Sequence, residues 1–126
     1  MAVYSKQFLS GAAAGRPVVI TGILPSTANT IHTAITGVTG AELDEVWLYG
    51  YVKAGVTTDR ELTVMWGITT ATGTGDDARR IPYVISWNGG LTPIIPGLPI
   101  REALTVKGYA TAADVIGVVG YVNRVT

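Results

Sequence analysis

The sequence predicts an all-β protein with a single antiparallel β-sandwich domain. Its 126 residues form a succession of short runs rich in Val, Ile, Thr, Tyr and Trp. Turn signals made of Gly, Pro and Asn separate these runs about every 8–12 residues, and no long amphipathic helical pattern competes with them. Seven or eight strands at this spacing favour a jelly-roll-like sandwich, with an immunoglobulin-like sandwich as the alternative.

The first residues, 1–16, are predicted to form an N-terminal arm, and residues 17–126 the sandwich domain. The large apolar side chains of the arm are Tyr4, Phe8 and Leu9, and a run of small residues follows them. A helix here would be short, uncapped and interrupted by glycine. We expect an extended arm that ends in a hinge, and an ordinary first strand remains an open alternative.

Alternation defines the next four predicted strands, which are 17–21, 27–35, 45–53 and 60–69. The segment 45–53 is the clearest of them. Its small and aliphatic residues share one face, while Trp47, Tyr49 and Tyr51 share the other. Because neither face is polar, we expect both to be covered, one by the core and one by another sheet or subunit.

Prolines shape the later elements. Further strands are predicted at 81–87, 103–110 and 115–125. Pro82 lacks a ladder donor, so its strand should begin after it or lie at an edge. The segment 91–100 contains Pro93, Pro96 and Pro99, which predicts an edge strand or an extended crossing segment.

The charge balance gives no sign of nucleic-acid or membrane binding. Nine basic and nine acidic residues give a formal net charge of zero, with no cysteine and one histidine. No apolar run reaches the roughly 18–20 residues that span a bilayer, and the N-terminus does not resemble a signal peptide. Zero net charge with 48% hydrophobic residues means weak colloidal repulsion, so we expect a protein that assembles.

The ionisable residues are scattered singly, whereas enzymes cluster them to shift their pKa values. His32 lacks the partners of a zinc site or a serine triad, and we expect a structural or surface histidine. Asp76 and Asp77 are expected to form an acidic loop tip paired with nearby arginines rather than a cation site. Asp44 and Glu45 are neighbours that should point to opposite faces of a strand. We therefore predict no catalytic, metal-binding or cofactor-binding residue, and a protein that is not an enzyme.

The three tryptophans receive different predictions. Trp66 and Trp87 lie in line with core-pattern residues and are expected to be buried anchors. Trp47 shares its face with Tyr49 and Tyr51, and it is the better candidate for an exposed or interfacial aromatic. The same three side chains are the basis of an alternative function, a carbohydrate-binding sandwich.

Several segments resemble small virion proteins of tailed bacteriophages. They are 3–11, 30–34, 44–49, 66–67, 95–98 and 120–125. The similarity runs over most of the chain in short β-type motifs. The resemblance implies a small β-sandwich that decorates or cements the capsid, often as a trimer at the junctions of major capsid subunits. It carries no catalytic residues with it.

We therefore expect a structural virion protein, a capsid cement or decoration subunit that is made in the host cytoplasm and lies on the capsid surface. Its expected partners are the major capsid protein and copies of itself, with a trimer favoured, and neither nucleic acid nor a membrane. The expected interface residues are Tyr4, Phe8, Leu9, Trp47, Tyr49 and Tyr51. A neck, tail or fibre-associated module is an alternative.

The arm is expected to attach by adding a strand to a neighbouring sheet edge. Deletion of residues 2–12 should then leave a folded protein that no longer attaches to its assembly.

Overall fold

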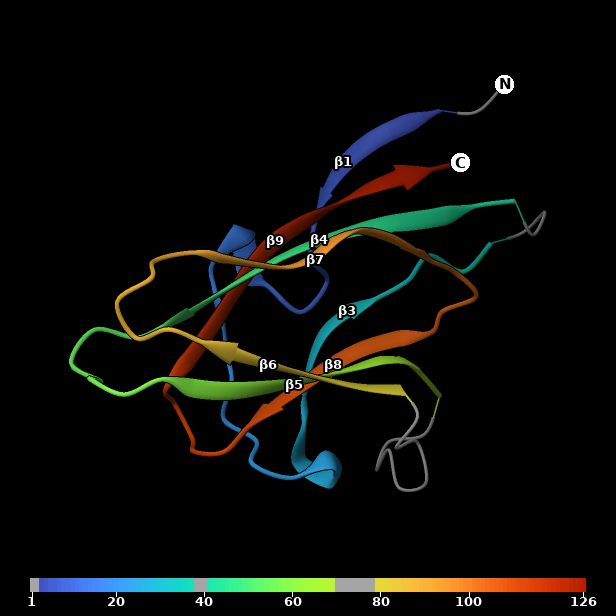
Figure 1. The fold of residues 1–126 in the computed structure, drawn as a ribbon. Coiled ribbons are helices and arrows are strands. Elements are labelled where there is room, and N and C mark those ends of the chain that lie inside the picture. Colours follow the sequence, from blue (N-terminus) through green and yellow to red (C-terminus); the bar gives the residue numbers. More distant parts are fainter. Residues whose placement is uncertain (1–2, 38–40, 70–78) are drawn as a thin grey trace.

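The protein is a sandwich of two antiparallel sheets (Figure 1). This computed structural model describes residues 3–37, 41–69 and 79–126. The strands are β1 (Tyr4–Phe8), β2 (Val18–Val19), β3 (Asn29–Thr33), β4 (Leu43–Val52), β5 (Arg60–Ile68), β6 (Arg80–Ile85), β7 (Thr92–Ile100), β8 (Thr105–Ala110) and β9 (Ile116–Val125). Two short 3-10 helices, η1 (Ala13–Gly15) and η2 (Pro25–Thr27), complete the described elements, and no described helix could span a membrane.

The strand order is that of a jelly roll. One sheet has the order β1-β9-β4-β7, with β2 also paired to β9, and the other has the order β3-β8-β5-β6. From β2 onwards the chain crosses between the sheets at every step except the β5–β6 hairpin. The jelly-roll prediction is confirmed. An immunoglobulin-like sandwich pairs several consecutive strands, so that alternative does not describe this order.

The first strand is broken into two parts. β1 pairs with the C-terminal half of β9, and β2 pairs with its N-terminal half. Between them the chain leaves the sheet: Leu9 enters the core, and the Gly11 N–H donates to the Ile31 carbonyl at 3.0 Å. Of the two structures left open for the arm, the ordinary first strand is therefore the one that residues 4–8 adopt.

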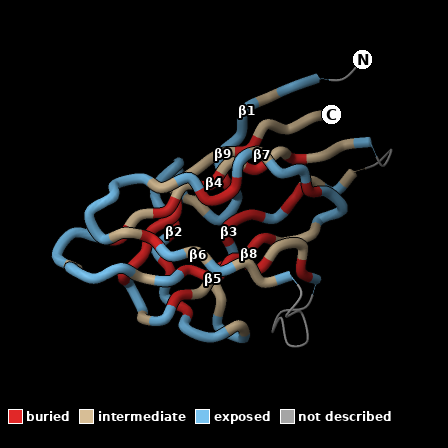
Figure 2. The backbone as a smooth tube through the Cα atoms, in the orientation of Figure 1, coloured by how far each residue is buried: buried red, intermediate tan, exposed pale blue. Residues whose placement is uncertain are grey.

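The core lies between the two sheets, where the buried residues gather (Figure 2). β4 shows the predicted alternation, because Val46 and Leu48 are fully buried while Trp47 and its odd-numbered neighbours are half-buried. Gly50 lets the sheets approach, since a Cβ there would lie 2.6 Å from Ile85 Cδ1 of the opposite sheet. Removal of these aliphatic groups from water is the main source of stability.

Both edge strands on one side of the sandwich contain proline. β7 is an edge strand, as predicted, and Pro93, Pro96 and Pro99 lie opposite alternate residues of β4. Proline is tolerated in a ladder only where the missing N–H would face away from the partner strand, so the free edge of β7 lacks these three donors. β6 is also an edge strand and contains Pro82, which agrees with the edge alternative.

Candidate functional site

The outer surface of β1 carries the most exposed residues of the predicted interface. Tyr4 and Phe8 are 71% and 67% exposed. Together with Lys6 they point to one side of the strand, because alternate residues of a strand share a face. Leu9 is a correction to the prediction: its side chain is 1% exposed and packs in the core, so it is not part of this surface.

β1 presents free backbone groups to solvent. Val3 and Thr126, just before β1 and after β9, exchange two backbone hydrogen bonds of 2.8 and 2.9 Å. Hydrogen-bonded and non-bonded pairs alternate along an antiparallel ladder, so Tyr4, Lys6 and Phe8 direct their N–H and C=O groups away from β9. Among the described strands, none pairs with β1 on that side.

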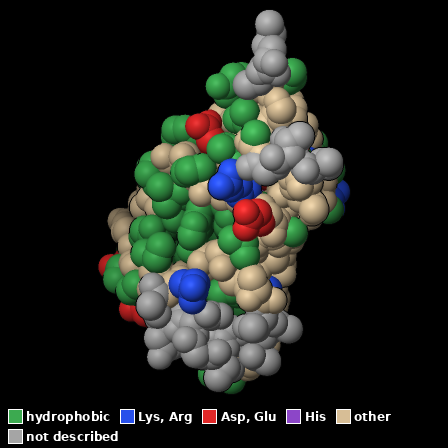
Figure 3. Space-filling view, turned by 90° about the vertical axis from the view of Figure 1, so that its right-hand side faces the viewer, with side chains coloured by type: hydrophobic (Ala, Val, Ile, Leu, Met, Phe, Trp, Pro, Cys, Tyr) green, Lys and Arg blue, Asp and Glu red, His purple; other side chains and the backbone are tan. Residues whose placement is uncertain are grey.

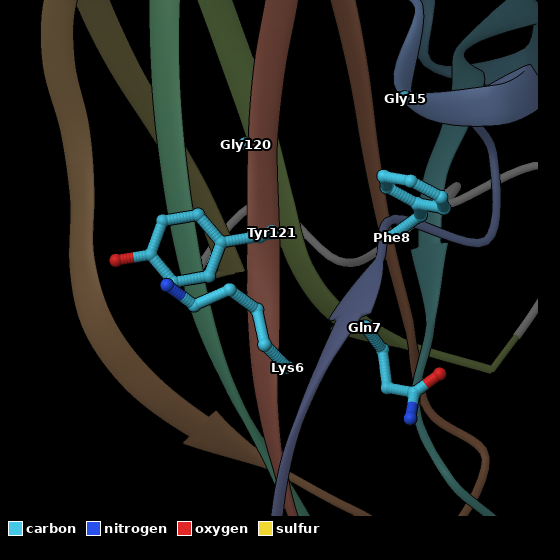
Figure 4. A pocket seen from close by; sticks show the side chains of 6 residues that line it. All are labelled: Lys6, Gln7, Phe8, Gly15, Gly120 and Tyr121. Carbon is cyan, nitrogen blue, oxygen red and sulfur yellow. The ribbon is translucent and has the colours of Figure 1, made fainter.

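A hollow of about 460 Å³ adjoins this strand on the outer face of the sheet (Figure 4). Its lining residues are Lys6, Gln7, Phe8, Gly15, Gly120 and Tyr121. Lys6 and Tyr121 extend to the same side, and the ammonium group lies 4.6 Å from the ring centroid, within cation–π range. Phe8 is turned toward Gly15 on the other side of the hollow. Cationic and aromatic groups on an open surface suit contact with another macromolecule.

The aromatic residues predicted on β4 pack against their own sheet. The Trp47 ring stacks on Tyr121 of β9, with centroids 6.1 Å apart and an interplanar angle of 13°. From β7, on the other side, Gly97 approaches so closely that a Cβ there would lie 2.7 Å from the Trp47 ring. The Tyr51 ring packs so closely over Gly117 that a Cβ there would collide with it, and Tyr49 is half-buried. A sugar that stacks on Trp47 would have to displace these contacts, which weakens the carbohydrate-binding alternative.

The other two tryptophans differ from each other. Trp66 is partly buried and packs against the core, as the alternation of β5 predicts. Trp87 is 44% exposed, so its predicted burial is wrong. The reason is that β6 ends at Ile85, and Trp87 follows in the turn, where its backbone N–H donates to Asp59 Oδ1 at 3.2 Å.

A charged cluster built around the buried Asp44 joins the two sheets. Asp44 of β4 accepts hydrogen bonds from Arg124 of β9, with Nε 2.8 Å from Oδ1 and a terminal guanidinium nitrogen 3.0 Å from Oδ2. His32 of β3, in the opposite sheet, places Nε2 2.7 Å from Asp44 Oδ2. The Ile35 N–H donates to the same oxygen at 3.1 Å. The cluster therefore ties β3 to β4 and β9.

The hydrogen bonds assign the His32 tautomer. The Ser10 backbone N–H donates to Nδ1 at 3.0 Å, so Nε2 carries the proton that is donated to Asp44. Burial raises the pKa of Asp44, but the hydrogen bonds from Arg124 and His32, together with the charge of Arg124, outweigh this effect and hold that pKa below its usual 3.8. The same carboxylate raises the pKa of Arg124.

This cluster is arranged for structure rather than nucleophilic catalysis. A serine triad needs the hydroxyl on the imidazole nitrogen that faces away from the carboxylate. Here the Ser10 backbone fills that position, while Ser10 Oγ accepts from the Thr33 N–H at 2.7 Å. His32 and Asp44 are fully buried, so a substrate would not reach them. His32 is therefore a buried structural residue and not a surface histidine, the two roles expected from the sequence.

Sequence reasoning missed this cluster, although one signal pointed to part of it. The alternation of β4 places Asp44 on the same side as Val46 and Leu48, which predicts a buried carboxylate that needs partners. Glu45, on the opposite face, is half-buried, in agreement with the prediction for this adjacent pair. Nothing in the local sequence indicated Arg124 as the partner.

The part of the chain that the structure describes offers no candidate metal site. Within residues 3–37, 41–69 and 79–126, no group of three or more histidine and acidic side chains could hold a metal ion. Asp76 and Asp77 lie outside the described residues. Their predicted pairing with arginines stays a prediction.

A second apolar surface lies at the end of the sandwich shown in Figure 3, where hydrophobic side chains gather between charged ones. A separate hollow of about 480 Å³ is lined by Trp66, Pro99 and Leu104, among others. Arg101 Nε and Glu102 Oε1 at its rim are 4.0 Å apart, and both side chains are more than half exposed. Such a pair is screened by water and is not the desolvated pair of an active site.

Comparison with known proteins gives no relative. No family model matches the sequence, and no match was found among the curated proteins or the solved structures. The function is therefore inferred from the fold and from the β1 surface.

Proposed function

We propose that this protein is a structural virion subunit that cements or decorates a phage capsid through protein–protein contacts. The observation that carries the proposal is β1, an edge strand with outward backbone groups and with Tyr4 and Phe8 mostly exposed. Jelly rolls recur in viral capsid proteins, which supports the proposal by analogy of fold alone. The resemblance of the short sequence motifs points in the same direction.

The proposed partner is the major capsid protein, contacted at the capsid surface by several copies of this chain, with a trimer favoured. Specific interfaces bury about 1,200–2,000 Å², and a few aromatic anchors carry most of the binding energy. Tyr4 and Phe8 are anchors of this kind. The protein is proposed to act by shape and adhesion and not as an enzyme.

The composition of the parent particle tests the proposal. Quantitative mass spectrometry of purified particles should find the protein in proportion to the major capsid protein, and electron microscopy should place it on the capsid surface. A few copies per particle would favour the neck, tail or fibre alternative instead. Absence from the particle would contradict both.

A double variant tests whether β1 makes the contact. Tyr4→Ser with Phe8→Ser should reduce binding to particles that lack the protein by more than about tenfold, because anchor side chains dominate interface energy. The matched control is Val84→Ser with Leu91→Ser, which removes two exposed hydrophobic side chains, 69% and 58% exposed, from another part of the surface. Equal binding by both double variants would contradict the role of β1.

A further inference from the structure

We infer that β1 accepts an extended strand of a partner protein that carries an acidic residue opposite Lys6 and apolar residues opposite Tyr4 and Phe8. The inference rests on the proposed function for the identity of the partner, and it adds the chemistry that β1 selects. Strand addition supplies backbone hydrogen bonds, and the side chains opposite alternate positions supply specificity.

Edge strands β7, β6 and β3 are each less open to a partner strand than β1. β7 lacks three outward donors because of its prolines, and β6 contains Pro82. β3 is covered by the chain after β1, where Ser10 Oγ accepts the Thr33 N–H and the Gly11 N–H donates to Ile31. β1 is the edge whose Tyr4, Lys6 and Phe8 keep both backbone groups directed outward.

A second copy of β1 is a poor occupant of this edge. An antiparallel pair that uses all three outward positions of both strands must place Tyr4 opposite Phe8 and Lys6 opposite Lys6. Like charges directly opposite each other destabilise a ladder. Any slipped register avoids this contact only by using fewer of the outward positions. Lys6 therefore acts against self-pairing, as lysine does on many edge strands.

The same lysine favours an acidic residue on the added strand. Its neighbour across the ladder is Asn123, which is uncharged, and its ammonium lies over the Tyr121 ring. The flexible four-carbon stem lets the ammonium reach a carboxylate on the opposite side of β1. Tyr4 and Phe8, two residues away on either side, offer ring surface to apolar residues at the matching positions of the partner.

Synthetic peptides test the inference without the virus particle. The probe is the heptapeptide Thr-Val-Thr-Glu-Thr-Val-Thr, compared with the same peptide carrying Lys at the centre, in an NMR titration of the full-length protein. We expect the Glu peptide to bind about tenfold more tightly, since the change replaces attraction by repulsion across the ladder. The amide signals of Tyr4, Lys6 and Phe8 should shift more than those of Ser5 and Gln7, whose N–H groups already face β9.

Charge reversal supplies the control. Lys6→Glu should invert the preference, and Lys53→Glu, the same change at another exposed position, should leave it unchanged. Equal affinity of the two peptides, an unaltered preference in Lys6→Glu, or no shift at millimolar peptide would overturn the inference. If the protein prefers the Glu peptide but is absent from the virus particle, only the proposed function is contradicted. If the protein is present in the particle but shows no preference between the peptides, only this inference is contradicted.

Discussion

At the scale of single residues, Asp44 illustrates how a charge can be tolerated in an apolar core. Its carboxylate is fully buried but accepts hydrogen bonds from Arg124, from His32 and from a backbone N–H. Desolvation is costly for an ion, and it is offset only when partners surround the group in good geometry. The cluster therefore fixes the relation between the sheets more than it adds net stability.

Asp44→Asn should lower the free energy of unfolding by about 3 kcal/mol, because it leaves a guanidinium facing a neutral amide in a buried position. Arg124 is 28% exposed, which allows some rehydration and keeps the loss at the lower end of the range. Urea denaturation measures the effect. Glu45→Gln, the same chemical change on the half-buried outer face, should alter stability by less than about 0.5 kcal/mol, and equal losses would contradict this account.

The pKa of Asp44 makes stability depend on pH in a defined direction. Because that pKa is lower in the folded protein than its usual 3.8, the unfolded chain takes up the proton first as the solution is acidified. The stabilising contribution is fully present above 3.8 and is lost as the pH falls through the pKa of the folded protein. The difference in unfolding free energy between wild type and Asp44→Asn should therefore shrink in acid, and parallel pH curves would contradict it.

At the scale of elements, the break after β1 separates an exposed edge strand from the core-supporting residues that follow it directly in the sequence. β1 is solvent-exposed along most of its length, while Leu9, Ser10 and Gly11 support the core and cover β3. Deletion of residues 2–12 removes both parts at once, so the expectation that the remainder folds normally is not supported by these contacts. A shorter deletion is needed to isolate β1.

Two truncations check this division. Removal of residues 1–7 should leave a cooperative thermal transition, because the lost side chains are largely exposed. Removal of residues 1–12 should cost a further 2–5 kcal/mol or so, the range for loss of a buried leucine, together with the Ser10 bond to His32. Thermal melts followed by circular dichroism measure both, and similar melting temperatures would show that Leu9 does not contribute to the fold as described.

The elements themselves were largely predictable, and the exceptions have physical causes. Alternation and breaker residues located β4, β5, β8 and β9 because their inward and outward faces differ in a local pattern. Trp87 was misplaced because the alternation continues past the last ladder position of β6. The partner of the buried Asp44 was not predictable, since Asp44 and Arg124 are 80 residues apart and meet only through the register of β4 with β9.

At the scale of the whole molecule, we expect the two sheets to unfold as one cooperative unit, because the Asp44 cluster and the interleaved chain path connect them. Every crossing from β2 to β5 and from β6 to β9 carries the chain between the sheets. Neither sheet can therefore form fully without the other. Pairing of distant segments also makes folding slow compared with proteins of local topology.

Two tryptophan reporters test this cooperativity. A variant with Trp66→Phe and Trp87→Phe reports on Trp47 in one sheet, and a variant with Trp47→Phe and Trp87→Phe reports on Trp66 in the other. In each variant, fluorescence and circular dichroism should give one coincident urea midpoint. A fluorescence transition that precedes the circular dichroism transition in either variant would show that the sheets unfold separately.

The prolines of β7 make the two edges of its sheet chemically unequal. The β1 edge keeps outward N–H and C=O groups, whereas the β7 edge lacks three N–H donors. If copies stacked edge to edge, with β1 of one against β7 of the next, three ladder positions would lack a donor, which disfavours the growth of fibres through this sheet.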